Sequence, residues 1–160
     1  MEQHNIPPLY DENSEILILG SFPSVKSREA QFFYNHPQNR YWKVMAAVYE
    51  SPVPESIEEK KALMLSNHAA MWDVIASCDI LGSSDSSIKN VIPNDIGRLL
   101  NETKIARIYT NGGTAHKYYQ KYIKGQTKME DIILPSTSPA NAQWSLERLI
   151  VAWKAQLKDM

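Results

Sequence analysis

The chain has 160 residues, which is enough for one well-buried domain and too few for two ordinary ones. With 43% hydrophobic residues, 22% charged residues and a formal net charge of -1, it has the composition of a soluble globular protein. No global field favours a polyanionic partner, so any nucleic-acid binding would come from a local patch.

Short apolar runs alternate with amphipathic segments along the chain. The apolar runs predict buried strands that lead into turns or loops within 14–21, 69–78, 105–113 and 131–142. The amphipathic segments predict helices at 40–50, 56–68, 95–104, 114–124 and 144–159. The Ser-rich segment 82–95 is predicted to be a loop.

This alternation of strands and helices predicts the fold class. We expect one domain spanning residues 1–160, with an α/β fold in which a three-layer α/β/α sandwich is built on a short, mainly parallel four-stranded sheet. In open parallel sheets the ligand lies beyond the carboxyl ends of the strands. The segments "GSFPS", "WDV", "TNGG" and "LPSTSPAN" fall at those ends, so the sequence predicts one site at that edge.

Three further features restrict the class of protein. The single cysteine, Cys78, cannot form an internal disulfide, as is common in cytosolic chains. No apolar run reaches membrane-spanning length, and the N-terminal "MEQHNIPPLYDENS" lacks the regions of a signal peptide. The four histidines stand far apart without acidic or cysteine companions at ligand spacing. We therefore expect a cytoplasmic protein with no membrane partner and no metal site, and a monomer by size.

Two proline-stiffened loops, 19–24 and 134–142, carry many of the hydroxyl groups at the predicted edge. One interpretation is an ordinary strand-to-loop turn in the first case and a turn before the C-terminal helix in the second. The alternative for the first loop is a rigid loop whose backbone N–H groups meet a substrate. The alternative for the second loop is contact with phosphates, because hydroxyls and free backbone amides are common partners of nucleic-acid phosphates. Neither loop has a GxGxxG or Walker lysine pattern, so a nucleotide-phosphate cradle is not expected.

Five motifs occur in one order over nearly the whole chain: "LILGSFPS", "HPQNRYW", "MWDVIASCDILGSSDSSIKN", "YTNGG" and "LPSTSPANA". With these motifs the chain resembles the uracil-DNA glycosylase superfamily, and most closely its hypoxanthine (deoxyinosine) DNA glycosylase branch. The resemblance implies DNA bound across the carboxyl edge of the sheet, with the target nucleotide flipped into a pocket. It also implies hydrolysis of the C1′–N bond to leave an abasic site, without a lyase step and without a metal or organic cofactor.

The resemblance also implies a catalytic residue. In most of the superfamily an Asp or Asn precedes the proline of the first motif and orients the water, but Phe22 stands there in this chain. In the hypoxanthine branch the asparagine of "HPQNRYW" is the catalytic candidate, which makes Asn39 the residue expected to hold the water in place. Its alternative is a structural amide that bonds loop backbone.

A second group is expected to bind the base. Tyr41 aligns with the aromatic that stacks on the flipped base, and its alternative is a core position at the start of a helix. Asp73 falls where relatives read the base edge, and a carboxylate there would accept a hydrogen bond from hypoxanthine N1–H. Its alternative is a helix or turn cap. Asp85 is the other acidic candidate for reading the base. The complete set of expected base-binding residues is Gly20, Ser21, Phe22, Tyr41, Asp73 and Asn111.

The remaining expectations concern the partner. The residues expected to contact DNA are Pro23, Ser24, His36, Arg40, Ser136, Thr137, Ser138 and Pro139. Arg28 and Lys43 are further candidates for phosphates. The lysine-rich segment 116–128 has the composition of a solvated helix face, and its alternative is contact with backbone phosphates. The expected partner is double- or single-stranded DNA that contains a deaminated base. The alternatives are a uracil- or xanthine-directed enzyme, and a non-catalytic nucleic-acid-binding module.

Overall fold

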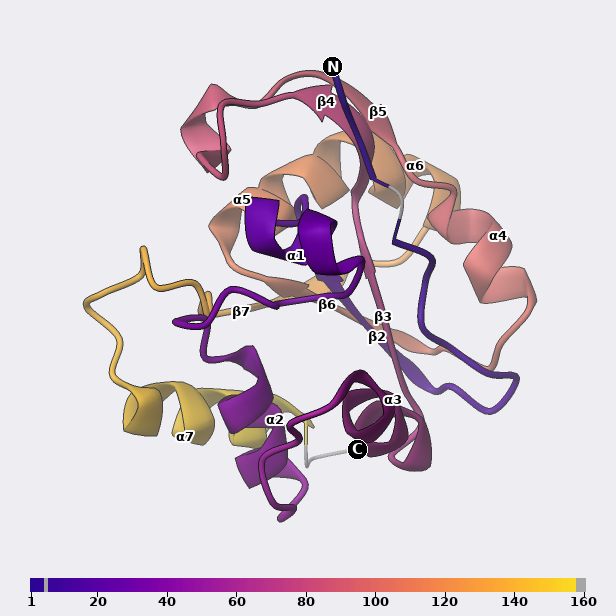
Figure 1. Cartoon of the computed structure of the whole chain (residues 1–160). Coiled ribbons are helices and arrows are strands. Elements are labelled where there is room, and N and C mark those ends of the chain that lie inside the picture. Colours follow the sequence, from indigo (N-terminus) through magenta and orange to yellow (C-terminus); the bar gives the residue numbers. More distant parts are fainter. Residues whose placement is uncertain (5, 158–160) are drawn as a thin grey trace.

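Four parallel strands form the central sheet of the computed structural model, which describes residues 1–4 and 6–157. In spatial order they are β3 (Ala69–Asp73), β2 (Ile16–Gly20), β6 (Arg107–Asn111) and β7 (Asp131–Leu134). All three pairings are parallel, as Figure 1 shows. The predicted four-stranded sheet is confirmed.

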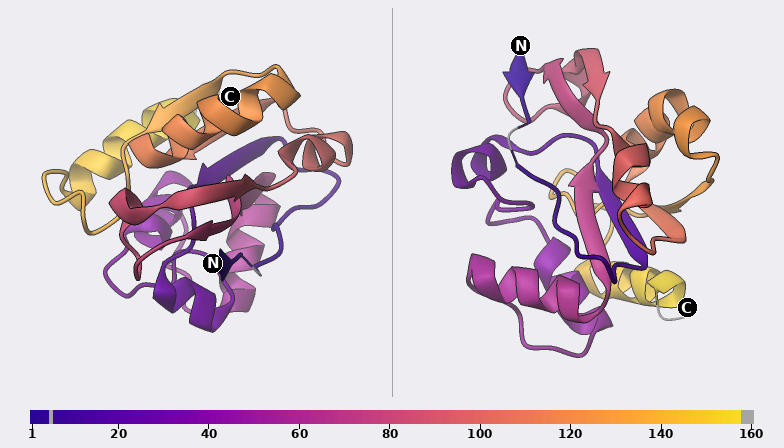
Figure 2. Two further views of the ribbon diagram at one scale, coloured as in Figure 1. Left: turned by 90° about the horizontal axis from the view of Figure 1, so that it is seen from above. Right: turned by 90° about the vertical axis from the view of Figure 1, so that its right-hand side faces the viewer.

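Helices cover both faces of this sheet. One layer contains α2 (Tyr41–Val48), α3 (Ile57–Ser66) and α7 (Leu146–Leu157), and the other contains α4 (Ile96–Asn101), α5 (Gly113–Tyr118), the π-helix η2 (Tyr119–Ile123) and α6 (Lys124–Thr127). Ile16 and Ile18 of β2 belong to the first core, whereas Leu17 and Leu19 belong to the second, because side chains alternate along a strand. Figure 2 shows the layers in two further views, and the predicted three-layer α/β/α fold is confirmed.

Helix boundaries follow local capping. Ser56 caps α3 by accepting from the Glu59 N–H. The short α1 (Val25–Ala30) was not predicted; Ser24 caps it by accepting from the Ser27 N–H. The predicted C-terminal helix is α7, and its last two predicted positions, 158–159, lie outside the described residues.

A second sheet was missed by the sequence analysis. The antiparallel order β1-β4-β5 joins β1 (Glu2–Gln3), β4 (Ile75–Asp79) and β5 (Lys89–Pro93). The turn predicted at the end of 69–78 and the loop predicted at 82–95 therefore both contain strand. The one-turn helix η1 (Asp85–Ser87) lies between β4 and β5. The prediction was wrong because three of the five β5 residues are exposed, which leaves no alternating apolar pattern to detect. Figure 1 shows this sheet at the top of the molecule.

The order of the central strands places the ligand site. The chain passes from β2 to β3 on one side and returns to β6 on the other side of β2. The loops after β2 and β6 therefore separate at the carboxyl edge, and a crevice of this kind is where open α/β sheets bind their ligands.

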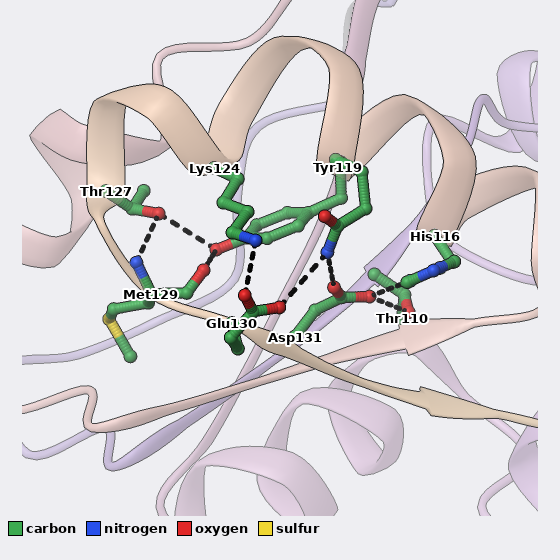
Figure 3. A network of polar contacts seen from close by, with 9 residues as sticks. Thr110, His116, Tyr119, Lys124, Thr127, Met129, Glu130 and Asp131 are labelled. Carbon is green, nitrogen blue, oxygen red and sulfur yellow. Dashed lines mark hydrogen bonds and ion pairs between the residues drawn. The ribbon is translucent and has the colours of Figure 1, made fainter.

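A polar network away from that crevice holds the second helical layer onto the sheet (Figure 3). The side chain of Asp131 at the start of β7 accepts hydrogen bonds from Thr110 (2.6 Å), His116 (2.7 Å) and Gln120 (2.6 Å). Its neighbour Glu130 pairs with Lys124 of α6. The network ties α5, η2 and α6 to β6 and β7.

Candidate functional site

A cavity of about 270 Å³ opens at the carboxyl ends of β2, β3 and β6. This is slightly below the roughly 300–1,000 Å³ of typical small-molecule pockets, so its size suits a single base better than a larger ligand. The predicted site residues that line it are Gly20, Ser21, Phe22, Pro23, Ser24, His36, Asn39, Asp73, Asn111, Ser136, Thr137, Ser138 and Pro139. Four predicted residues lie outside this lining: Tyr41, Arg40 and the two further phosphate candidates, Arg28 and Lys43.

Asn39 is held in the cavity wall by its carbonyl end. Its Oδ1 accepts from the Tyr41 backbone N–H (2.9 Å) and from the Thr137 hydroxyl (2.9 Å). Because both of these partners are donors there, the side-chain oxygen must face them, and the Nδ2 end has no hydrogen-bond partner among the described residues. The amide is therefore oriented to offer a donor to the cavity.

Thr137 supports this arrangement from a fully buried position. Its hydroxyl accepts from Asn111 Nδ2 (3.0 Å), and its backbone N–H donates to Asn111 Oδ1 (3.1 Å). Thr137 was predicted to contact DNA, and the structure corrects this: its hydroxyl is consumed within the protein. It connects Asn111 at the end of β6 to Asn39, which lies two residues before α2.

Asp73 is fixed by a residue that the sequence analysis missed. Asp73 is only 3% exposed, and its Oδ2 lies 2.7 Å from Nε2 of His4, whose side chain is fully buried. The Ile6 N–H donates to His4 Nδ1 (3.3 Å), so the ring proton lies on Nε2 and is donated to Asp73. The two residues are 69 positions apart, and an isolated histidine near the N-terminus carried no signal for this pairing.

The cavity is lined by the aromatic residues Phe22, Phe33 and Tyr34. The structure corrects the prediction that Tyr41 stacks on the base, because Tyr41 is fully buried in the core beneath α2 and α7. Its ring stacks on that of Tyr34, with centroids 4.1 Å apart and an interplanar angle of 15°, and it meets Trp153 edge-on. Tyr34 lines the cavity in its place.

Arg40 also has a role other than the predicted one. Its guanidinium donates to the carbonyl oxygens of Thr137, Ser138 (2.8 Å), Asn141 (3.0 Å) and Trp144. The structure therefore corrects its assignment as a DNA contact, because a guanidinium with four backbone partners is not free to bind phosphate. Arg40 instead fixes the loop that follows β7.

The serine side chains around the cavity accept hydrogen bonds from backbone N–H groups and so stabilise the loops that carry them. Ser24 caps α1, Ser136 Oγ accepts from the Ser138 N–H (3.1 Å), and Ser138 Oγ accepts from the Ala140 N–H (3.1 Å). His36 Nδ1 accepts from the Gln38 N–H (3.1 Å). The roles of these side chains toward DNA stay predictions.

Two charged candidates remain, the acidic Asp85 and the basic Arg28. Asp85 lines the cavity, and burial raises the pKa of its carboxyl while the hydroxyls of Thr114 and Ser21 act in the opposite direction. Arg28 lies over the Phe22 ring at 5.3 Å and donates to the Gly82 carbonyl (2.7 Å). Arg28 is thereby held within the protein, so it is a poorer candidate for phosphates than the sequence suggested.

Within the described residues, no group of three or more His, Cys, Asp or Glu side chains is arranged to hold a metal ion. Of the helices in the same part of the chain, none is long and apolar enough to cross a membrane.

The fold and the site define a class of protein: an α/β protein with a small cavity at a topological switch point, between a fixed amide and a fixed carboxylate. The model of the Uracil DNA glycosylase superfamily matches residues 7–158, and the chain belongs to that superfamily. The resemblance found from the five motifs is therefore confirmed.

Individual relatives agree over nearly the full length. A Methanosarcina acetivorans protein named hypoxanthine DNA glycosylase is 33% identical over 149 residues, covering 92% of this chain and 94% of its own. A Methanosarcina barkeri protein of the same name is 29% identical over 160 residues, covering 99% of each chain. The solution NMR structure of an M. acetivorans protein, proposed to be a uracil DNA glycosylase, superposes with a TM-score of 0.82 at 33% identity over 96% of this chain and 95% of that one.

Proposed function

We propose that this protein is a monofunctional DNA glycosylase that hydrolyses the N-glycosidic bond of hypoxanthine in DNA and leaves an abasic site. The names of the two curated relatives support hypoxanthine as the base. The catalytic part of the proposal rests on the orientation of Asn39. Two hydrogen bonds hold its side-chain oxygen, so its NH₂ group is left to face the cavity. A group fixed in this way acts without reorganisation when the substrate arrives.

The reaction needs only water and the flipped nucleotide. The glycosidic bond cannot be reached inside a duplex, so the nucleotide turns into the cavity. The oxygen of a water molecule bonds to C1′, the C1′–N electron pair leaves with the base, and a proton from the water ends on that base. Asn39 Nδ2 donates a hydrogen bond to the water oxygen and holds the water near C1′. Holding the two reactants in a reactive geometry lowers the entropic cost of the reaction.

The residues around the cavity support hydrolysis without a lyase step. A lyase step needs an amine that attacks C1′, and no lysine belongs to the lining of the cavity within the described chain. The cavity is also lined by Pro23, His36, Ser136, Ser138 and Pro139, and we expect the DNA backbone to contact the protein beside these residues.

The test is base release from duplexes that differ only in one base: hypoxanthine, uracil, xanthine or adenine. Alkaline cleavage of the abasic product is measured under single-turnover conditions, and DNA binding is measured in parallel. We expect release of hypoxanthine by the wild type and a loss of about 100-fold or more in Asn39→Ala, the size expected when one fixed donor is removed. Asn101→Ala, an exposed position of α4, is the matched control and should keep the wild-type rate.

The other outcomes are equally specific. Release of uracil or xanthine in preference to hypoxanthine would assign the same chemistry to a different base. Binding of DNA by both the wild type and Asn39→Ala, with no release of any base by either, would make the protein a binding module and overturn the proposal.

A further inference from the structure

The hydroxyl of Tyr34 is a buried donor without a partner. Its oxygen is inaccessible to solvent and has no hydrogen-bond partner of good geometry within the described residues, although the side chain lines the cavity. Burial, and then the nearby Asp73 carboxylate, raise the pKa of this hydroxyl far above its ordinary value. A hydrogen bond from the Asn111 side chain to the tyrosine oxygen acts in the opposite direction, and it leaves the tyrosine proton without an acceptor in the described part of the chain. The group is therefore a protonated donor at neutral pH. Leaving such a donor unpaired is unfavourable, so it needs an explanation.

Tyr34 is also held in an unusual conformation. Its backbone φ is 52°, in the left-handed region that an aromatic residue rarely adopts. The stack on the buried Tyr41 fixes the plane of the ring. Strain of this kind persists where the surrounding structure requires it and is common at ligand sites. The plane of the ring is thus fixed before any ligand binds.

Gly20 lies next to both the Tyr34 hydroxyl and the Asp73 carboxylate. A Cβ atom on Gly20 would be 2.4 Å from Asp73 Oδ1 and 2.8 Å from the Tyr34 hydroxyl oxygen, so both oxygens converge on one point of the cavity wall. The other carboxylate oxygen, Oδ2, is already bonded to His4. An acceptor and a donor therefore stand side by side at this wall, where only glycine leaves them room.

We propose that Tyr34 and Asp73 together read a lactam edge on the flipped base, meaning a ring N–H beside a carbonyl. Asp73 Oδ1 accepts from the N–H, Tyr34 donates to the carbonyl oxygen, and His4 is a positioning residue that fixes Oδ2. This assignment rests on the proposed function and names its substrate class, which is bases such as hypoxanthine, xanthine and uracil. Deamination converts a ring nitrogen beside an amino group into this edge, so the pair recognises the product of deamination.

The same pair disfavours the parent bases. Adenine presents a ring nitrogen lone pair where the lactam presents N–H, and this lone pair would face the carboxylate. Guanine and thymine carry the lactam edge but are well paired in normal duplex, and extrusion is easiest for mismatched or damaged bases. Selection would therefore combine the edge reading with the ease of flipping.

Tyr34→Phe tests the donor, because it removes the hydroxyl and keeps the ring. We expect hypoxanthine release under single-turnover conditions to fall about 10- to 100-fold, the range for losing one hydrogen bond to a buried group. The melting temperature should stay level or rise, since the hydroxyl proton has no acceptor among the described residues of the free protein. Tyr49→Phe, a half-buried tyrosine at the end of α2 that does not line the cavity, is the matched control and should match the wild type in both measurements.

Asp73→Asn tests the acceptor independently. His4 would hold the amide oxygen, so the NH₂ group would face the base N–H, and the ratio of hypoxanthine to adenine release should fall at least 10-fold, as expected when a hydrogen-bonding site loses its match. Two outcomes would overturn the proposed recognition of the lactam edge and leave the proposed function unaffected. One is a rate of hypoxanthine release by Tyr34→Phe within twofold of an active wild type. The other is a ratio of hypoxanthine to adenine release by Asp73→Asn equal to that of the wild type. A wild type that releases no base would instead remove the proposed function itself.

Discussion

Tyr41 and Tyr34 form one stacked pair in which only Tyr34 faces the cavity. Tyr41 is fully buried and contacts Trp153 of α7, so its ring contributes to the core between two helices. We expect Tyr41→Ala to lower the free energy of unfolding by about 3–5 kcal/mol, the usual effect of truncating a buried aromatic to alanine. Urea denaturation followed by tryptophan fluorescence measures this.

A different result would restore the prediction from sequence. If Tyr41→Ala unfolded at the same urea concentration as the wild type but no longer released base, Tyr41 would be a substrate contact. Val151→Ala, an exposed position of α7, serves as the control for truncation on the surface and should change stability little.

The sequence could place the cavity residues but could not choose between these tyrosines. Gly20, Asp73 and Asn111 end strands, so the parallel sheet brings them to one edge. Tyr34 lies in an irregular segment, and its left-handed backbone and its stack on Tyr41 are set by tertiary contacts. The order of the family motifs indicated Tyr41, two residues after Asn39, as the aromatic that contacts the base. In the structure the ring of Tyr41 lies in the core instead.

The loop after β7 depends on Arg40. One guanidinium bonds four backbone carbonyls between Thr137 and Trp144, and the Arg40 N–H also donates to the Thr137 carbonyl (3.1 Å). We expect Arg40→Ala to loosen this loop, lower the melting temperature and slow base release. Arg40→Lys should rescue little, since a lysine ammonium cannot reproduce the planar fork of donors.

Salt dependence separates this role from a phosphate contact. A residue that neutralises one phosphate lowers the slope of log K against log salt concentration by about 1 when removed. For Arg40→Ala we expect weaker DNA binding with an unchanged slope. Arg107→Ala, an exposed arginine at the amino end of β6, is the matched control and should leave both affinity and slope unchanged. A slope reduced by about 1 in Arg40→Ala would return this residue to the DNA interface.

The second sheet explains why His4 was missed. The pairing of β1 with β4 and the bond from the His4 N–H to the Ala76 carbonyl (2.6 Å) place this histidine over Asp73. Both contacts join residues that are far apart in sequence, and β1 has only two residues. No local sequence pattern therefore predicts these contacts. The segment also covers the edge of β3, where Leu9 and Met71 exchange two backbone hydrogen bonds (2.9 Å each).

At the scale of the whole molecule, the order of apolar runs was sufficient to predict the layers. The strand Ile16–Gly20 is buried at every position, as expected for a central parallel strand covered by helices on both faces. The crossing from β3 back to β6 then creates the crevice that receives the ligand. What the sequence could not supply was the network of side-chain contacts between layers, on which the stability of the second helical layer depends.

Asp131 makes that stability dependent on pH. Burial acts to raise the pKa of this carboxyl, but hydrogen bonds from Thr110, His116 and Gln120 outweigh it, and the pKa is lowered overall. A carboxyl with a lower pKa in the folded state stabilises the fold when it is ionised. Its contribution is complete above the ordinary Asp pKa near about 4, and it is lost as the pH falls through the folded-state value.

We therefore expect the gap in melting temperature between the wild type and Asp131→Asn to be wide at pH 7 and to close as the pH is lowered from about 5 to about 3. The asparagine keeps the shape of the side chain and cannot ionise, so the closing of the gap reports the charge alone. Glu12→Gln, an exposed position outside the network, should follow the wild type throughout. A gap that stayed constant over this range would mean that Asp131 supports α5 and η2 through its shape and not through its charge.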